Sequence, residues 1–297
     1  MTSTSVSGGP FARLIRFEDA AGNIHFGEPN VTSAELLEKH AAQGTLEATV
    51  FEGASIFSLV RSSEVVQVSK ILSLLAPEDV PIVKCVGLNY IKHIQEGGRK
   101  PPPYPSIFVK PRTSVAGFNE DIPIPKLAQD DQLDYEGELC IVIGKTGKNI
   151  PKSAALEHIA GFVVSNDVSA RKWQRDAAYA GGVPQWCFSK GFDKFAPLGP
   201  VLVSPSVVRN AGNLRLQTRV NGELRQDSNT SDLLFGTEAI VEFVSQGTTL
   251  EAGTVIMTGT PAGVAMGMKE PKWLKDGDVV EVAIEHLGSV KNRMVFE

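Results

Sequence analysis

The sequence contains no long apolar run and little cysteine. Because no apolar run reaches the roughly 18 residues that a membrane-spanning helix requires, we expect no transmembrane helix and no membrane partner. The 3 cysteines, Cys85, Cys140 and Cys187, are widely spaced among apolar residues, which favours reduced thiols and a cytoplasmic location. A mitochondrial location is the alternative, because Arg13 and Arg16 follow a serine-rich start, although residues 11–17 alternate like a first strand.

The chain also has no excess of basic charge. Its 29 Lys and Arg residues are interleaved with 34 Asp and Glu residues, for a net charge of -5, so we expect no nucleic-acid partner. The G-x-S-x-G elbow, the H-E-x-x-H motif, paired cysteines, the phosphate loop and the dinucleotide fingerprint are all absent. These absences weigh against a serine hydrolase, a zinc protease and a dehydrogenase.

Changes in composition along the chain predict a tail and two domains. Residues 1–10 are expected to form a disordered tail, residues 11–76 a small β-rich domain, and residues 77–297 a larger catalytic domain. In the small domain, one helix is predicted over residues 33–40, with Ser33 as its N-cap. The strands expected there cover residues 12–17, 24–26, 48–51 and 55–60.

In the larger domain, strands outnumber helices and do not alternate regularly with them. This pattern predicts an α+β fold with a mixed or antiparallel sheet, one that can roll up into a barrel. Helices are expected at residues 168–179 and 231–246, and a hairpin turn at Asn221-Gly222. The expected strands cover residues 83–87, 106–110, 200–203, 214–220, 253–257 and 278–284.

Two glutamates stand at the start of an apolar run. Glu136 and Glu138 lie two residues apart in D-Y-E-G-E-L-C-I-V-I-G (134–144), so on a strand they point the same way. A second apolar run, residues 161–165, leads to Asp167. Three converging carboxylates need a cation, and oxygen ligands suit Mg²⁺, Mn²⁺ or Ca²⁺ better than Zn²⁺. The alternative is a solvated strand face, but apolar neighbours of both parities favour a buried strand.

Asp167 also opens the helix predicted over residues 168–179. Residues 167, 171 and 174 would share one face of that helix, so Arg171 and Gln174 would point into a site at Asp167. A guanidinium there can hold a substrate carboxylate through two hydrogen bonds. The alternative is an ordinary N-cap followed by a solvated polar face.

A histidine and a glutamate stand three residues apart in Asn89-Tyr-Ile-Lys-His93-Ile-Gln-Glu96. Across one helical turn, Glu96 could fix the tautomer of His93 and raise its basicity, as a general base requires. A structural histidine is the alternative. The polar, glycine- and proline-rich segment that follows, residues 97–105, is a candidate lid.

Two lysines and a threonine complete the set of candidates. Lys110 and Lys190 stand among apolar residues, where a lysine either extends to the surface or binds an anion, such as a developing enolate. Thr260 lies in the turn T-G-T-P-A-G (258–263) after a predicted strand, where hydroxyls and backbone N–H groups could bind a carboxylate.

These motifs, in this order, resemble the fumarylacetoacetate hydrolase family, in particular its acylpyruvase and oxaloacetate decarboxylase members. The similarity runs from about residue 82 to the C-terminus, and residues 13–27 resemble the short N-terminal domain of many members. The matching motifs are G-x-N-Y-x-x-H-x-x-E (87–96), K-P (110–111), D-Y-E-x-E-L (134–139), N-D-V-S-A-R (166–171), K-G-F-D (190–193) and T-G-T-P-A-G-V (258–264).

The resemblance implies a homodimer built on a mixed β-roll, and a divalent metal on the three carboxylates. That metal would be Mg²⁺, with Mn²⁺ as an alternative and Ca²⁺ as a non-physiological substitute. The implied metal ligands are Glu136, Glu138 and Asp167, the catalytic residues His93, Glu96 and Lys190, and the substrate-binding residues Lys110, Arg171, Gln174 and Thr260.

The leading hypothesis from these residues is metal-dependent cleavage of a carbon–carbon bond. The substrate would be a keto acid or diketo acid: an acylpyruvate for hydrolysis, or a β-keto dicarboxylic acid such as oxaloacetate for decarboxylation. One alternative is an isomerase, hydratase or dehydratase of a related 2-keto or enol acid, similar to the hydroxymuconate isomerases. Another is a non-catalytic metal-binding or scaffolding protein in which the three carboxylates are structural.

Overall fold

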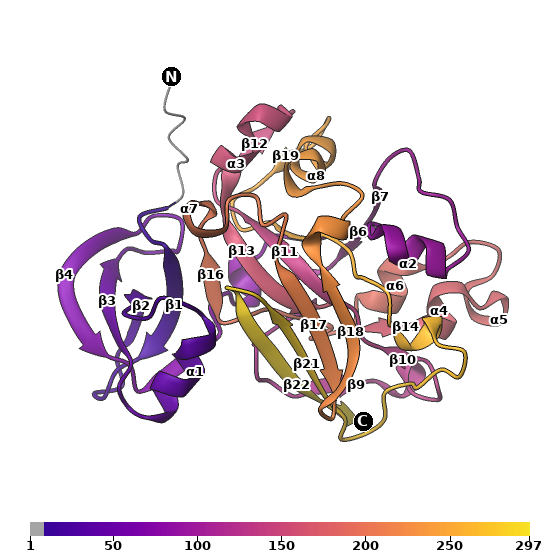
Figure 1. Cartoon of the computed structure of the whole chain (residues 1–297), viewed down its shortest axis with the longest axis horizontal. Helices are drawn as coiled ribbons and strands as arrows, with labels where there is room; N and C mark the ends of the chain where they lie inside the picture. Colours follow the sequence, from indigo (N-terminus) through magenta and orange to yellow (C-terminus); the bar gives the residue numbers. More distant parts are fainter. Residues whose placement is uncertain (1–8) are drawn as a thin grey trace.

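The protein is built on a large mixed sheet with a second sheet packed against it (Figure 1). The computed structural model describes residues 9–297, so the tail predicted for residues 1–10 lies mostly outside the described residues. The α+β class and the mixed sheet are confirmed. Within the described residues the 11-stranded sheet is open, with β4 and β7 at the ends of its strand order, and does not close into a barrel.

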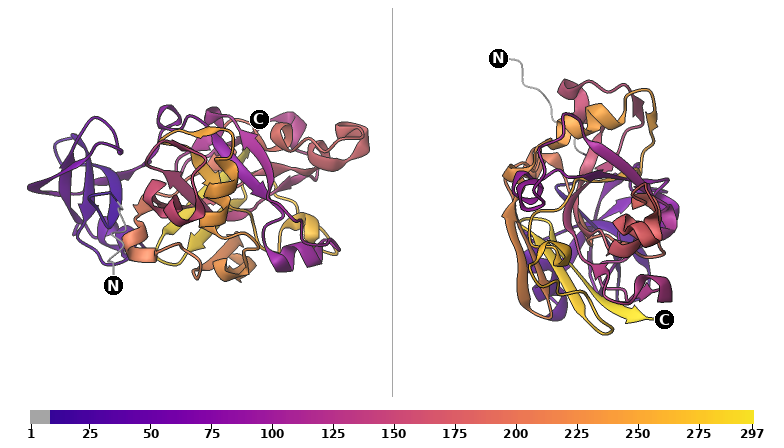
Figure 2. Two further views of the ribbon diagram at one scale, coloured as in Figure 1. Left: turned by 90° about the horizontal axis from the view of Figure 1, so that it is seen from above. Right: turned by 90° about the vertical axis from the view of Figure 1, so that its right-hand side faces the viewer.

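The N-terminal strands form a lobe at one end of the molecule, and helices α4 to α6 lie at the other end (Figure 2). Strand β1 pairs with β16, so this lobe extends the large sheet, and the domain division after residue 76 stays a prediction. The lobe consists of β1 (Arg13–Glu18), β2 (Ile24–Pro29), α1 (Glu35–Ala42), β3 (Glu47–Glu52), β4 (Val60–Gln67) and β5 (Lys70–Leu72).

Two local predictions in the lobe are wrong. Helix α1 begins at Glu35 after an N-cap at Ala34 that makes no side-chain hydrogen bond, so Ser33 is not the N-cap. The strand predicted over residues 55–60 is a turn, because Ser55 and Ser58 bond to each other, and β4 starts only at Val60.

The main domain supplies the rest of the large sheet. Its strands are β6 (Val83–Gly87), β7 (Ser106–Lys110), β11 (Gly137–Ile143), β13 (Ile159–Asn166), β16 (Val201–Val203) and β20 (Val255–Met257). Strands β20 and β6 are parallel, whereas β11 runs antiparallel to both β13 and β20. Every residue of β11 is buried, which confirms the prediction of a strand covered on both faces.

The second sheet covers one face of β11 and β13. It consists of β17 (Arg215–Val220), β18 (Glu223–Asn229), β21 (Val279–Ile284), β22 (Gly288–Phe296) and β9 (Ile122–Ile124). The predicted hairpin between β17 and β18 is confirmed, and both of its turn residues have positive φ, 50° at Asn221 and 82° at Gly222. The apolar residues between the sheets, such as Leu139, Val282 and Leu216, form the largest core cluster.

Short elements complete the fold. The helices are α2 (Ile91–Glu96), α3 (Ala155–His158), α4 (Arg171–Arg175), α5 (Ala177–Ala180), α6 (Trp186–Lys190), α7 (Pro205–Val208) and α8 (Thr237–Val244). The short strands are β8 (Val115–Ala116), β10 (Leu133–Asp134), β12 (Gly147–Lys148), β14 (Ser169–Ala170), β15 (Ala196–Pro197) and β19 (Thr249–Leu250). Among the helices of residues 9–297, none is long and apolar enough to cross a membrane.

Both long helices predicted for the main domain are interrupted. The segment predicted over residues 168–179 begins as strand β14, which pairs with β10, and then forms two short helices joined at Asp176. The segment predicted over residues 231–246 begins in a 3-10 turn, Thr230–Asp232, and becomes α-helical only at Thr237, because Leu234 and Phe235 donate backbone hydrogen bonds to Asn89. In both cases a long-range contact of the backbone overrides the local helical pattern.

Gly137 lies in close contact with the second sheet. A Cβ atom at this position would overlap Thr218 Oγ1 and approach Val282 Cγ1 to 2.9 Å. We therefore expect Gly137→Ala to lower the free energy of unfolding by about 1–3 kcal/mol, as overpacking does. Urea unfolding measures this effect. Gly182→Ala is the control, since nothing lies within 4 Å of its Cβ, and an equal loss in both variants would contradict the close approach.

Candidate metal centre and active site

Three buried carboxylates meet at the ends of two interior strands of the large sheet. Glu136 precedes β11, Glu138 is its second residue, and Asp167 follows β13. One ligand oxygen from each lies within 4.8 Å of the other two, and the three residues are only 7%, 2% and 0% exposed. The convergence expected from the sequence is therefore present, and this group could hold a divalent metal ion.

Backbone pairing places these carboxylates. Strands β11 and β13 are antiparallel, with Gly137 opposite Asn166, so the start of one strand lies beside the end of the other. The Glu136 N–H donates to Asn166 Oδ1 at 2.9 Å, and the Asp167 N–H donates to the Glu136 carbonyl at 2.8 Å. These two hydrogen bonds hold Glu136 and Asp167 together before any metal binds.

Two buried lysines contact Asp167 from different sides. Lys190 Nζ, at the end of α6, donates to Asp167 Oδ2 at 2.6 Å, to Glu136 Oε2 at 2.7 Å and to Ser169 Oγ at 2.6 Å. Lys110 Nζ donates to Asp167 Oδ1 and to the Phe195 carbonyl, each at 2.6 Å. Burial by itself would lower the pKa of Lys190, but Asp167 and Glu136 raise it above its usual value, so Lys190 stays charged.

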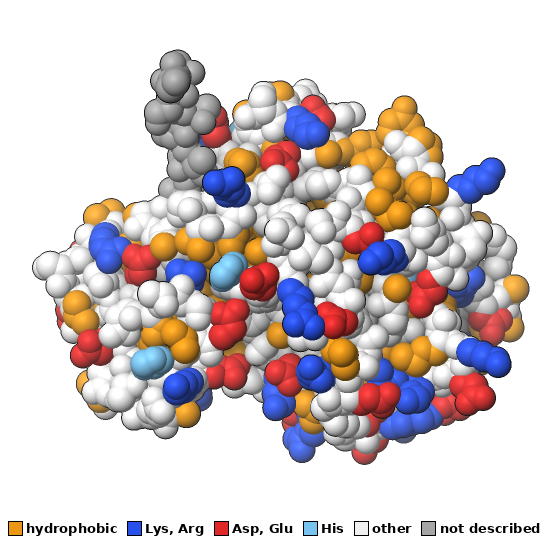
Figure 3. Space-filling model, viewed as in Figure 1, with side chains coloured by type: hydrophobic (Ala, Val, Ile, Leu, Met, Phe, Trp, Pro, Cys, Tyr) orange, Lys and Arg blue, Asp and Glu red, His pale blue; other side chains and the backbone are white. Residues whose placement is uncertain are grey.

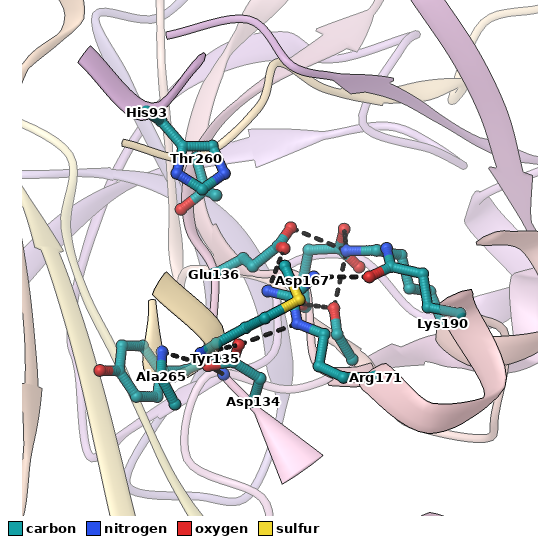
Figure 4. A network of polar contacts seen from close by, with 12 residues as sticks. His93, Asp134, Tyr135, Glu136, Asp167, Arg171, Lys190, Thr260 and Ala265 are labelled. Carbon is teal, nitrogen blue, oxygen red and sulfur yellow. Dashed lines mark hydrogen bonds and ion pairs between the residues drawn. The ribbon is translucent and has the colours of Figure 1, made fainter. Parts of the chain in front are cut away.

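Arg171 contacts the second carboxylate oxygen of Glu136, the one that Lys190 does not bind (Figure 4). It forms an ion pair with Glu136, donates from Nε to Asp134 Oδ2 at 2.8 Å, and donates from Nη1 to Gln174 Oε1 at 2.9 Å. The expected helix beginning at Asp167 is wrong, because Asp167 precedes the strand residues 169–170. Arg171 and Gln174 still converge, since both belong to the single turn of α4 and are 5% exposed.

Asp134 is a buried residue of the site. It belongs to the D-Y-E-x-E-L motif (134–139), but no role was predicted for it from the sequence. Besides Arg171, its carboxylate accepts hydrogen bonds from the backbone N–H groups of Tyr135, Ala265 and Met266. Asp134 therefore joins the start of β11, helix α4 and the turn after β20. The available signal was its position two residues before Glu136, in the same motif.

Glu138 differs from its two partners because no lysine or arginine bonds to it among residues 9–297. Its Oε2 accepts a hydrogen bond of 2.7 Å from the Gly259 N–H. Burial raises the pKa of Glu138 well above its usual value, and the charges of Asp167 and Glu136 raise it further. Burial also opposes the charge of Glu136, but Arg171 and Lys190 hold the pKa of Glu136 below its usual range. The set of oxygen ligands fits a hard divalent cation, which would supply the positively charged partner that Glu138 lacks.

The turn after β20 needs a glycine to reach Glu138. Gly259 has φ of +102°, and a Cβ there would lie 2.9 Å from Asn89 Cβ and 3.0 Å from the Val86 carbonyl oxygen. The next residue, Thr260, is 5% exposed; its hydroxyl donates to the Gly137 carbonyl at 3.0 Å and accepts from Gln226 Nε2 at 2.8 Å. Gln226, on β18, is thus a positioning residue that no local sequence signal identifies.

Glu136 and Glu138 line a cavity of about 280 Å³, which is also lined by residues of α2 and of the start of the segment after it. His93 and Glu96 line this cavity, and His93 Nδ1 lies 3.1 Å from Glu96 Oε2. Gln174, Lys190 and Thr260 line it as well. Lys110 does not, because its unexposed ammonium lies behind Asp167, so we assign it the positioning of Asp167 instead of contact with substrate.

Comparisons with known proteins match most of the chain. Residues 82–295 match the family model for the fumarylacetoacetate (FAA) hydrolase C-terminal domain. The chain is 40% identical over 293 residues, 95% of its own length and 91% of the relative, to "Oxaloacetate tautomerase FAHD2B, mitochondrial" of Bos taurus. It is 38% identical over 280 residues, 91% of its own length and 87% of the relative, to "Oxaloacetate tautomerase FAHD2A, mitochondrial" of Homo sapiens.

Solved structures resemble the whole chain. The 5-carboxymethyl-2-hydroxymuconate delta-isomerase of Mycobacterium smegmatis superposes with a TM-score of 0.76 at 32% identity, over 96% of this chain and 100% of that one. A fumarylacetoacetate hydrolase from psychrophilic Exiguobacterium antarcticum superposes with a TM-score of 0.72 at 35% identity, over 96% and 99%. Both similarities cover the N-terminal lobe as well as the main domain.

The position of Glu138 makes the metal site testable. We expect Glu138→Gln to weaken Mn²⁺ binding by about 100-fold or more, because a carboxylate ligand is lost. The metal-free variant should melt no lower than the wild type, because burial and the neighbouring carboxylates disfavour the charged form of Glu138 and an amide carries no charge. Calorimetric titration with Mn²⁺ and thermal melting measure the two effects.

The exposed Glu270→Gln is the matched control and should leave metal binding unchanged. A purely structural role for the three carboxylates would give the opposite pair of results, with unchanged Mn²⁺ affinity and a lower melting temperature in Glu138→Gln.

Proposed function

The chain belongs to the fumarylacetoacetate hydrolase family, and on that premise we propose that it is a divalent-metal-dependent tautomerase. Its substrate would be a 2-keto dicarboxylic acid of the oxaloacetate type, whose enol and keto forms it interconverts. The observation that carries this proposal is that the buried carboxylate site and the His93–Glu96 pair line one cavity. The names of the relatives that are about 40% identical across almost the whole chain support the choice of reaction.

The carboxylate end of the site would bind the 2-keto acid group. A divalent cation held by Glu136, Glu138 and Asp167 would withdraw charge from the keto oxygen and so stabilise an enolate. Gln174 Oε1 accepts from Arg171, which leaves the Gln174 amide nitrogen to donate to the carboxylate of the substrate. Lys190 is held charged by Asp167 and Glu136, and its ammonium would add to the stabilisation of the anion.

His93 would move the proton. The Glu96 carboxylate is hydrogen-bonded to Nδ1, so Nε2 is the ring nitrogen that would exchange a proton with the substrate. In the direction from enol to keto, the enol oxygen gives up its proton, His93 donates a proton to C3, and the electron pair of the double bond forms the new C–H bond. The released proton restores His93 through solvent, and no carbon–carbon bond breaks. General acid–base catalysis of this kind contributes ~10²- to 10⁴-fold to the rate.

This role of the histidine predicts a large loss of activity. We expect His93→Gln to lower the rate of enol oxaloacetate ketonisation by ~10²- to 10⁴-fold with Mg²⁺ present, and Glu96→Gln to lower it less. The loss of enol absorbance in the ultraviolet measures the rate. Both variants should keep the Mn²⁺ affinity of the wild type, since neither residue belongs to the three carboxylates. Wild-type rates in His93→Gln would refute the assignment, and Lys92→Gln, beside it on α2, is the control.

Cleavage of a carbon–carbon bond is the second candidate, and the match to the hydrolase family model favours it. The same histidine, backed by Glu96, could activate a water for attack on the distal carbonyl of an acylpyruvate. Released pyruvate and carbon dioxide distinguish the reactions, because a tautomerase releases neither from oxaloacetate above the uncatalysed rate. If pyruvate or carbon dioxide appears as fast as the substrate disappears, the reaction is cleavage and the tautomerase proposal is wrong.

We also propose a homodimer in which the second copy covers the edge strand β7. This strand is the last of the large sheet, and it exposes Ile107 and Val109, with Tyr104 69% exposed just before it. Apolar side chains gather at the loop that leads into β7 in the space-filling view (Figure 3). An exposed apolar edge strand favours association.

The edge strand gives a direct test of the dimer. We expect Val109→Lys to shift the sedimentation coefficient from that of a dimer to that of a monomer, because a charge is placed on an apolar contact. Leu127→Lys is the control, since Leu127 is 41% exposed and belongs to another surface. A monomeric wild type, or a variant that still sediments as a dimer, would contradict β7 as the interface.

A further inference from the structure

The basic residues of the cavity fall into two groups. Its lining includes Lys190 and Arg171, which are bound to the buried carboxylates. It also includes Arg99 and Arg175, neither of which forms an ion pair with a carboxylate anywhere in residues 9–297. The acidic Glu96 that lines the same cavity is bonded to His93. Two positive charges therefore face the cavity without a negative partner.

Helix α4 places Arg175 in the lining of the cavity, one turn away from the carboxylate site. It is the last residue of α4, one turn after Arg171, and residues four apart on a helix lie on the same side. Its Nη1 contacts Met266 Sδ at 3.3 Å. Burial lowers the pKa of Arg175, and the positive charges of Arg99 and Arg171 lower it further, so the guanidinium of Arg175 lies close enough to those two to be repelled by them.

Arg99 reaches the same part of the cavity from α2. The helix ends at Glu96 with Gly97 as its C-cap, and Gly98 takes the left-handed φ of +65° that turns the chain. The Arg99 N–H then donates to the Ile94 carbonyl at 3.0 Å, which fixes the backbone of Arg99 to the helix that carries His93. The first residues of the segment 97–105 are thus anchored, and Arg99 lines the cavity from that anchor.

We propose that Arg99 and Arg175 together bind the distal carboxylate of the substrate and so select dicarboxylic over monocarboxylic keto acids. An anion between two like charges removes their repulsion, and guanidinium groups bind carboxylates with paired hydrogen bonds. This inference rests on the proposed function, because the carboxylate site must hold the 2-keto acid end for the distal end to reach the arginines. Neither residue contacts the reacting atoms, so both are specificity residues.

The experiment compares two substrates that both enolise. Enol oxaloacetate carries a distal carboxylate, whereas 2,4-dioxopentanoate carries a neutral acetyl group in its place. We expect Arg99→Gln and Arg175→Gln each to lower kcat/KM for oxaloacetate by about 10-fold, and the double variant by about 100-fold, the size of charge-assisted hydrogen bonds. For 2,4-dioxopentanoate, kcat/KM should stay within about twofold of the wild type.

Two controls isolate the charge at these positions. Lys100→Gln removes the same charge one residue away from Arg99 and outside the cavity lining, so it should affect neither substrate. Arg175→Lys keeps the charge and should retain most of the preference for oxaloacetate. Equal losses on both substrates in the Gln variants, or no loss on oxaloacetate, would overturn the proposal.

A binding measurement separates this proposal from the proposed function. Calorimetry on the Mg²⁺-loaded protein compares malate with 2-hydroxybutanoate, which has a methyl group in place of the distal carboxylate. The wild type should prefer malate, and the double Gln variant should lose about 100-fold of that preference while binding oxalate as before. If the wild type turns over neither keto acid, the proposed function fails, and the binding preference alone decides the role of the arginines. A wild type that binds malate no better than 2-hydroxybutanoate would refute the role proposed for the two arginines.

Discussion

The structure depends on the balance of charge inside one buried cluster. Burying a carboxylate is costly unless a cation and hydrogen bonds compensate it, and removing one member of a buried ion pair costs several kcal/mol. Four carboxylates and three cations meet here, and the backbone around them is folded to bring them together. The carboxylates belong to Asp134, Glu136, Glu138 and Asp167, and the cations to Lys110, Lys190 and Arg171. Glu138 is the member left without a cation, which is why the cluster fits a further divalent ion.

Each structural layer contributes one part of that balance. The antiparallel pair β11 and β13 places Glu136 beside Asp167, and the glycine turn after β20 points a backbone N–H at Glu138. The second sheet holds this turn through Gln226 on β18. Because these groups are fixed by main-chain hydrogen bonds and by packing between two sheets, the carboxylate end of the cavity is rigid. The groups that meet the rest of the substrate stand on short helices and loops instead, where they can vary without disturbing the cluster.

Local sequence patterns predicted much of this site. Period-two alternation and buried runs identified β6, β7, β17 and β21, and the spacing of Glu136 and Glu138 predicted their common direction. The i, i+3 spacing of His93 and Glu96 likewise matches their contact on α2. Such inferences succeed because each depends on neighbours within a few residues.

Local patterns in the chain thus indicate which residue types stand at the site and which of them share a strand or a helical turn. What each side chain faces depends on the tertiary fold. The helix expected at Asp167 gave way to a strand pair with β10, and Lys110, which looked equivalent to Lys190, lies behind Asp167 outside the cavity. Arg99 and Arg175, which form no ion pair within the part of the chain that the structure describes, also came together only in the fold. Burial and long-range pairing depend on segments far apart in the chain, and local periodicity carries no information about them.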